Sequence, residues 1–230
     1  MISTEKIDLP EFDDINLKLQ LKKLYISSGI PVKYHFQSLE TGWSTVTSPV
    51  GKLTGSAKKR SEVVKLLFEA YIKALDSIMS GEGLRILLKD RVEIISDLFI
   101  DGKKSSGKSF LLSVIGQESI IRGHKVKYID WVDYLDRFQT FESRDANEEY
   151  FQNCINCDLL IIDSVYDYNI NNNKYFLIQF DRLISNRQNS GKITICSVDT
   201  SQGMPVFGPV WNRFSRETYS IKLPEPSIKA

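Results

Sequence analysis

Residues 98–109 read LFIDGKKSSGKS, and this stretch decides the fold class of the 230-residue chain. The apolar run LFI (98–100) predicts a buried strand, and residues 107–122 predict an apolar helix. Between them, Gly102-Lys-Lys-Ser-Ser-Gly107-Lys108-Ser109 matches the pattern G-x-x-x-x-G-K-[ST]. The string alone arises by chance in roughly 1% of chains this long. A strand before it and a helix after it are the context that indicates a phosphate-binding loop.

The residue types in this loop suit a nucleotide. Glycines permit positive φ and a close backbone approach, so successive N–H groups and the helix N-terminus can point at phosphate oxygens. We expect Lys108 to meet the β- and γ-phosphates and the Ser109 hydroxyl to hold Mg²⁺. The alternative is a solvated surface turn, which the flanking strand and helix disfavour. The expected nucleotide-binding residues are Gly102, Lys103, Lys104, Ser105, Ser106, Gly107, Lys108, Ser109 and Phe110.

A second acidic element completes such a site. Residues 158–163 read DLLIID, a buried strand that ends in Asp163, 55 residues after Lys108. Ligands gather outside the carboxyl ends of strands in open α/β sheets, so we expect Asp163 to reach Mg²⁺ through water. Asp at a strand end is also an ordinary turn residue, and the pairing with the loop favours the metal role.

The residue after Asp163 departs from the usual pattern. ATPases of this kind carry a second acid there to orient the attacking water, and this chain has Ser164. A general base contributes roughly 10²–10⁴ in rate, so its loss predicts a weak ATPase that still binds nucleotide. Asp167 replaces it only if the following loop folds back.

The rest of the second half alternates strand and helix patterns. Such alternation predicts right-handed βαβ units and a mostly parallel sheet covered on both faces, so the fold class is α/β. Residues 218–223 alternate like an edge strand. The other expected elements are strands at 125–129, 159–162 and 192–198, helical stretches between 131 and 157, and a helix at about 173–188.

The first half is less regular. Residues 27–55 are rich in Gly, Pro, Ser and Thr, and predict a loop held by Tyr34, Phe36 and Trp43. Residues 1–28 are acidic and then apolar and basic. Leu17, Leu21 and Leu24 lie at helical spacing, which favours a helix, whereas the alternation of Ile15, Leu17, Leu19 and Leu21 is also typical of a strand. The apolar face of the helix either packs on the protein's own core or docks on a partner. That face carries Leu17, Leu21 and Leu24.

Residues 61–79 predict a helix with Ser61 as N-cap and a stop before Gly81. Its expected buried stripe is Val63, Val64, Leu67, Tyr71, Leu75 and Ile78.

Composition excludes several classes of protein. The sum of 30 Lys and Arg against 29 Asp and Glu leaves a net charge of +1, which argues against a nucleic-acid coat protein. Three cysteines cannot close a disulfide framework, and the apolar runs fall short of the roughly 20 residues of a membrane helix. We therefore expect a cytoplasmic protein. The lone pair Cys154 and Cys157 lacks the further ligands of a zinc site, so Mg²⁺ is the one metal expected.

Longer stretches resemble a known family. Residues 28–40 (SGIPVKYHFQSLE), residues 102–129 and the strand DLLIID are similar to AAA+ ATPases of the DnaC/DnaI helicase-loader group and the related IstB transposition ATPases. The similarity runs from about Leu19 to Leu223. It implies a P-loop (AAA+/ASCE) three-layer sandwich at residues 56–226 without a full helical lid. Residues 1–55 are then a short N-terminal extension for partner docking, and their shortness indicates a phage or plasmid version.

The end of the chain resembles the arginine-finger segment of the replication initiator DnaA and its loader relatives. Residues 210–216 read VWNRFSR. The resemblance implies that Arg213 is a finger acting in trans on a neighbouring copy, so that the chain self-associates through this face. Arg216 is the second choice, and an ordinary surface arginine is the alternative. A guanidinium suits the role because it forks onto phosphate oxygens and keeps its charge.

One sensor position also departs from the family. Val198 stands where the family has a sensor Asn, which leaves Ser197 as the sensor candidate, with Asp199 or Thr200 as alternatives.

The resemblance implies a helicase loader in DNA replication that uses ATP/ADP and Mg²⁺ and engages a replicative hexameric helicase and single-stranded DNA in a bacterial or phage-infected cell. Aromatic residues at 131–150 either stack on DNA bases or belong to the core. They are Trp131, Tyr134, Phe138, Phe141 and Tyr150. An IstB-like transposition or packaging adaptor with little turnover is the alternative, and Ser164 favours it. A small-molecule kinase is disfavoured because no basic lid sequence is seen.

Overall fold

The computed structural model describes residues 15–47, 55–88, 91–139, 144–165, 174–199 and 218–224. The helices are α1 (Ile15–Ser28), the 3₁₀ helix η1 (Val32–Tyr34), α2 (Leu39–Thr47), α3 (Gly55–Lys73), α4 (Leu75–Met79), α5 (Lys108–Ile121), α6 (Trp131–Gln139), α7 (Arg144–Asn156) and α8 (Lys174–Asn189). The strands are β1 (Leu84–Leu88), β2 (Arg91–Ile95), β3 (Leu98–Asp101), β4 (Val126–Asp130), β5 (Leu159–Asp163), β6 (Ile193–Val198) and β7 (Tyr219–Lys222). Within these ranges no helix is both long and apolar enough to cross a membrane.

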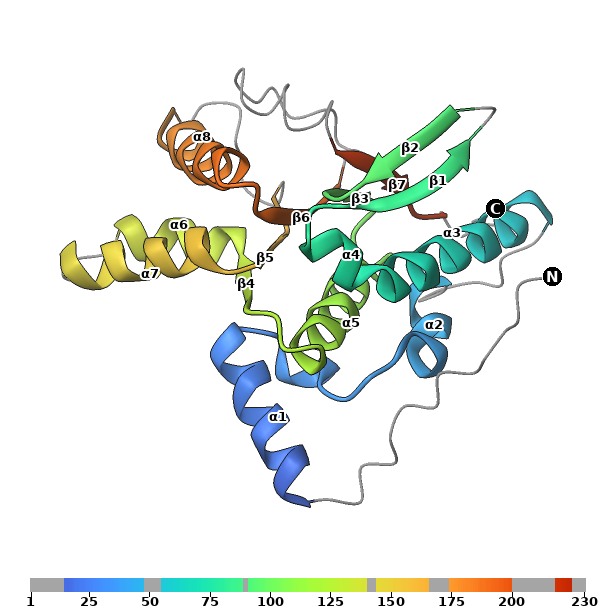
Figure 1. Cartoon of the computed structure of the whole chain (residues 1–230), viewed down its shortest axis with the longest axis horizontal. Helices are drawn as coiled ribbons and strands as arrows, with labels where there is room; N and C mark the ends of the chain where they lie inside the picture. Colours follow the sequence, from blue (N-terminus) through green and yellow to red (C-terminus); the bar gives the residue numbers. More distant parts are fainter. Residues whose placement is uncertain are drawn as a thin grey trace.

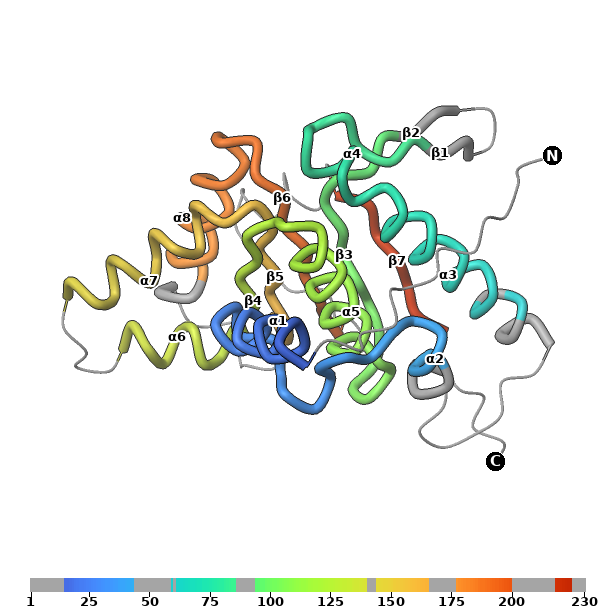
Figure 2. Tube along the Cα trace, turned by 60° about the horizontal axis from the view of Figure 1, so that its bottom comes forward, coloured from blue at the N-terminus to red at the C-terminus, as the bar shows by residue number. Residues whose placement is uncertain are grey.

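The main sheet has five parallel strands in the order β4-β5-β6-β3-β7. Figure 2 shows these strands side by side, with α5 lying along them. The predicted strands are confirmed, and β7 is an edge strand as expected. Strand β6 lies between the loop strand β3 and the Asp163 strand β5. Parallel strands end at the same edge, so the loop and Asp163 are brought to one edge of the sheet.

Helices cover both faces of the sheet, so the predicted three-layer sandwich is confirmed. Every residue of β3, β5 and β6 is buried. In β5, Leu159 and Ile161 pack in one core cluster with α5, while Leu160 and Ile162 pack in the other with α6, α7 and α8. Figure 1 shows α6, α7 and α8 on one side of the sheet and α1, α3 and α5 on the other. This two-sided burial explains why the strands have continuous apolar sequences.

The N-terminal helix packs against the sandwich. Helix α1 contacts α5 and β4, and Leu21 and Tyr25 belong to the same core cluster as α5. The predicted helix is confirmed, and Leu21 faces the protein's own core. Leu17 and Leu24 flank this buried line and are about half exposed.

The predicted loop at 27–55 is wrong at residues 39–47, which form α2. The N–H of Thr41 donates to Ser38 Oγ at 3.3 Å, so Ser38 acts as an N-cap three residues before it. Tyr34 and Trp43 pack against the core as expected, whereas Phe36 is half exposed.

The predicted helix at 61–79 begins earlier and breaks once. Helix α3 starts at Gly55, so Ser61 lies inside it, and Ala74 separates α3 from α4. Val63 is 65% exposed, and the fully buried Phe68 takes its place on the core side. The true stripe has helical spacing throughout. It consists of Val64, Phe68, Tyr71, Leu75 and Ile78.

Strands β1 and β2 form an antiparallel hairpin that the sequence interpretation missed. Leu84 pairs with Ile95 and Leu88 with Arg91, so only residues 89 and 90 separate the strands. The hairpin lies next to α4 (Figure 1). Two five-residue apolar runs around a two-residue Lys-Asp connection are a signal that could have revealed it.

A buried arginine holds α7, α8 and β6 together. Arg187 on α8 is fully buried, and its guanidinium donates to carbonyl oxygens at the carboxyl end of α7, including Cys154 O at 2.8 Å and Ile155 O at 2.9 Å. It also donates to Thr194 Oγ1 of β6 at 3.0 Å. A cation suits this place because the end of a helix leaves carbonyl groups unpaired and carries partial negative charge.

Replacing Arg187 by Leu should lower the free energy of unfolding by roughly 3–5 kcal/mol, because several buried carbonyl groups would lose their donor. Urea unfolding followed by circular dichroism measures this loss. The control is Arg182→Leu on the same helix, which removes an exposed pair with Glu148 and should cost far less stability than the Arg187 substitution. Equal effects of the two substitutions would contradict the structural role of Arg187.

Candidate functional site

The loop between β3 and α5 has a backbone shape that depends on two glycines. A Cβ atom on Gly102 would lie 2.5 Å from Ser106 Oγ and 3.2 Å from Leu223 Cβ, so no side chain fits there. Gly107 has φ 95° and Ser105 has φ 64°, both in the left-handed region. The loop is therefore a tight turn that leads directly into α5.

The amino end of α5 is suited to an anion. Gly107 is its N-cap and makes no side-chain capping hydrogen bond. The Oγ of Ser106 is buried and, within the described residues, has no hydrogen-bond partner. The amino end of a helix carries partial positive charge, and together with a buried hydroxyl group it forms a cradle that fits a phosphate. These residues therefore fit the nucleotide that the motif predicts.

The lysines of the loop differ in their placement. The ammonium group of Lys108 donates to Gly102 O at 2.5 Å and to Lys103 O at 2.9 Å, which places it along the inside of the loop. Lys103 and Lys104 are exposed. The N–H of Lys104 donates to the Asp199 carboxylate at 2.9 Å. Asp199, one of the two alternatives to Ser197 as sensor, therefore contacts the loop.

Asp163 lies at the same edge of the sheet and is buried. The Tyr128 hydroxyl donates to its Oδ2 at 2.7 Å, and the Ser197 hydroxyl donates to its Oδ1. Each carboxylate oxygen thus has a donor, which holds the plane of the carboxylate in one orientation.

Ser197 also holds the residue after Asp163. The backbone N–H of Ser164 donates to Ser197 Oγ at 2.9 Å, and Ser164 has φ 60°. A non-glycine residue in this region is strained, and such strain concentrates at functional sites. The Ser197 side chain is fully buried behind Asp163. Its sensor role stays a prediction, as do the phosphate and metal roles of the loop residues and Asp163.

Tyr128 is a site residue that the sequence interpretation missed. It lies on β4, where it pairs with Ile161, two residues before Asp130 pairs with Asp163. Burial raises the pKa of Tyr128 well above its usual range, and the neighbouring charge of Asp163 raises it further. Tyr128 is therefore protonated and acts as a donor. The sequence signal that could have revealed this role is a tyrosine two residues before the end of β4, the strand next to DLLIID.

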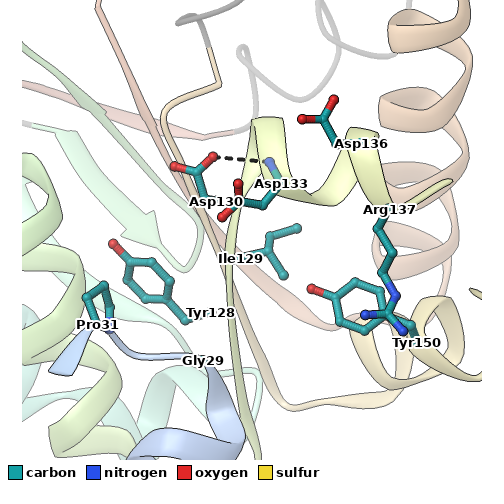
Figure 3. Close-up of a pocket in the computed structure, with 9 residues that line it drawn as sticks. All are labelled: Gly29, Pro31, Tyr128, Ile129, Asp130, Asp133, Asp136, Arg137 and Tyr150. Atoms are coloured by element: carbon teal, nitrogen blue, oxygen red, sulfur yellow. Dashed lines mark hydrogen bonds between the residues drawn. The ribbon is translucent and has the colours of Figure 1, made fainter. Parts of the chain in front are cut away.

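A separate cavity of about 430 Å³ lies at the end of β4 (Figure 3). Three carboxylates line it, those of Asp130, Asp133 and Asp136. Asp130 accepts the N–H of Val132 at 2.9 Å and thereby caps α6, and burial raises its pKa. Across the cavity the Arg137 guanidinium lies 4.5 Å from the centre of the Tyr150 ring. The acidic lining disfavours phosphate, so this cavity is distinct from the loop cradle.

Of the two interpretations of the aromatic residues at 131–150, the core interpretation holds for the first two residues. Trp131 and Tyr134 are buried and stack on each other with ring centres 5.0 Å apart, and Phe180 of α8 packs against Trp131. They belong to the core, as the alternative interpretation held. Phe138 and Tyr150 pack against the same cluster.

Several predicted residues lie outside the described residues. They are Phe141, Asp167, Thr200, Arg213 and Arg216. Within the described ranges no group of three or more His, Cys, Asp and Glu side chains could hold a metal ion. Cys154 and Cys157 are buried beside Arg187. A magnesium ion would therefore depend on the nucleotide together with Ser109 and Asp163.

Comparison with known sequences gives one kind of relative. No family model matches the chain. It is 36% identical over 132 residues to the chromosomal replication initiator protein DnaA of Aliarcobacter butzleri, covering 50% of this chain and 30% of that one. It is 25% identical over 179 residues to DnaA of Campylobacter jejuni, covering 70% of this chain and 39% of that one. The chain thus spans well under half the length of these curated relatives.

Comparison with solved structures shows a shared fold. The DnaC helicase loader superposes with a TM-score of 0.60 at 13% identity, over 84% of this chain and 99% of that one. DnaA bound to AMPPCP and single-stranded DNA gives 0.58 at 18% identity, over 85% and 51%. DnaI gives 0.54 at 14% identity, over 87% and 95%. The strand order, the loop and these superpositions together show that the chain has the P-loop AAA+ fold of the DnaA, DnaC and DnaI proteins.

Proposed function

We propose that this chain is an ATP-binding AAA+ protein of DNA replication initiation. The observation that carries the proposal is the phosphate cradle at the end of β3, with Asp163 at the same edge of the sheet. The sequence similarity to DnaA and the fold shared with AMPPCP-bound DnaA support it.

The roles follow from the chemistry of each residue. The loop amides and the first N–H groups of α5 bind phosphate oxygens, and Lys108 turns from the loop carbonyls to the β- and γ-phosphates. Ser109 and Asp163 hold Mg²⁺, with Asp163 acting through water. When bound, Mg²⁺ neutralises charge on the phosphates. Ser164 has no carboxylate to orient water, so hydrolysis is slow and ATP serves mainly as a switch for assembly.

Replacing Lys108 by Ala should weaken binding of a fluorescent ATP analogue by roughly 10–100-fold, because a charge-assisted contact with the phosphates is lost. Fluorescence titration measures the change. The control is Lys192→Ala, which removes a lysine paired with Asp158 at the opposite end of the sheet and should leave the affinity unchanged. Undiminished binding by the Lys108 variant would refute the proposed site.

As part of the same proposal, the protein acts in the cytoplasm as a helicase loader. It engages a replicative hexameric helicase and single-stranded DNA, with residues 1–55 as the docking segment and residues 56–226 as the ATPase domain. Two structural neighbours, a helicase loader and a DnaA bound to single-stranded DNA, support these partners. Arg213 completes the nucleotide site of a neighbouring copy.

Arg213→Ala should keep nucleotide affinity but lose ATP-dependent assembly, and should lower any hydrolysis seen with partners by roughly 10³-fold or more. Analytical ultracentrifugation with the cognate helicase and single-stranded DNA, with and without ATP, measures assembly. Arg182→Ala on α8 is the control. Assembly of the Arg213 variant at wild-type level would remove the finger from the proposal.

Ser164, which stands in place of a second acid after Asp163, favours one other candidate function, an IstB-like transposition or packaging adaptor in which the nucleotide site supports assembly with little turnover. This candidate predicts association with a transposase that does not depend on nucleotide, and no association with the helicase.

A further inference from the structure

A buried hydroxyl group holds one of the two residues to which the proposed function assigns the metal ion. On β4, the Tyr128 hydroxyl donates to Asp163 Oδ2 at 2.7 Å. On α5, the Ser113 hydroxyl donates within its own helix, to the carbonyl oxygen of Ser109 at 2.7 Å. Tyr128 therefore fixes one oxygen of the acid at the end of β5.

Water competes little for these bonds. Tyr128 and Asp163 are each 5% exposed, and Ser113 is fully buried. Since Ser197 donates to the other oxygen of Asp163, loss of the Tyr128 hydroxyl would leave that carboxylate with one of its two side-chain donors. Groups that orient a metal ligand in this way tune the affinity for the metal without touching it.

We propose that Tyr128 is a positioning residue for the divalent cation: its hydroxyl orients Asp163. The inference rests on the proposed function, since it assigns a determinant of cation affinity within the same site. Tyr128 sets how tightly Mg²⁺ binds, whereas the loop amides set how tightly the phosphates bind.

The tyrosine ring has a separate role, which allows the hydroxyl to be tested alone. The ring lines the cavity in Figure 3 beside Pro31, and Gly29 lines the same wall. Tyr128→Phe keeps this packing and removes only the hydrogen-bonding group. The variant therefore separates the orientation of Asp163 from the packing of the segment that follows α1.

The test measures binding of N-methylanthraniloyl-ATP to the full chain, first in EDTA and then over a series of Mg²⁺ concentrations. For Tyr128→Phe we expect an unchanged nucleotide affinity in EDTA. We expect the Mg²⁺ concentration that gives half of the Mg²⁺-dependent increase in nucleotide affinity to rise roughly tenfold. Mn²⁺ replaces Mg²⁺ in a second measurement, where electron paramagnetic resonance counts the bound ion directly.

The matched control is Tyr71→Phe. Tyr71 is fully buried, and its hydroxyl donates to Ser96 O at 2.5 Å, at the amino end of β3, away from the loop. This variant also loses one buried hydrogen bond. It should lower the melting temperature about as much as Tyr128→Phe and leave the Mg²⁺ series unchanged.

Three results would overturn the inference. A Mg²⁺ series for Tyr128→Phe that matches wild type would show that the hydroxyl does not act on the cation, while the proposed function would stand. An equal loss of affinity in EDTA and in Mg²⁺ would show a general structural role. A wild-type protein that binds no nucleotide under either condition would remove the proposed function and this inference together.

Discussion

The carboxyl end of β6 holds the candidate site together. Three successive residues, 197–199, contact the site across the edge of the sheet. The Ser197 hydroxyl donates to the Asp163 carboxylate, the Val198 carbonyl oxygen accepts the N–H of Gly102, and the Asp199 carboxylate accepts the N–H of Lys104. The loop and the acid come from strands β3 and β5, which are not neighbours, and β6 lies between them.

This arrangement depends on burial of both faces of the sheet. Strands β3, β5 and β6 are covered by helices at every position, so their edge cannot shift without disturbing two apolar cores. On one face Arg187 joins the end of α7 to β6, and on the other the Tyr128 hydroxyl of β4 holds the carboxylate at the end of β5. These polar groups are buried, and each is satisfied by a partner from another element.

Prediction from the sequence succeeded where periodicity and motif agreed. The run 98–122 contains a strand, a glycine-rich turn and a helix, and all three follow from local rules on apolar spacing and glycine conformation. It failed where one local signal was weak or had two meanings. The pattern predicts a loop at Ser38, which caps α2, and a helix cap at Ser61, through which α3 continues. Serine is common in both settings, so residue type alone could not decide between them.

The aromatic residues after β4 show that prediction of function from residue type has the same limit. Trp131 and Tyr134 have the composition of a base-stacking surface, but whether they face solvent or α8 depends on helix packing that the spacing does not encode.

The sequence by itself determined the α/β class, the parallel strands and the phosphate loop, because each arises from neighbours along the chain. Only the tertiary structure decided that Tyr128 and Ser197 hold the two oxygens of Asp163, and that Asp199 accepts a loop N–H. These contacts join residues 34, 35 and 95 positions apart, and a hydrogen bond over such a distance exists only once the order of the strands has brought its two ends together.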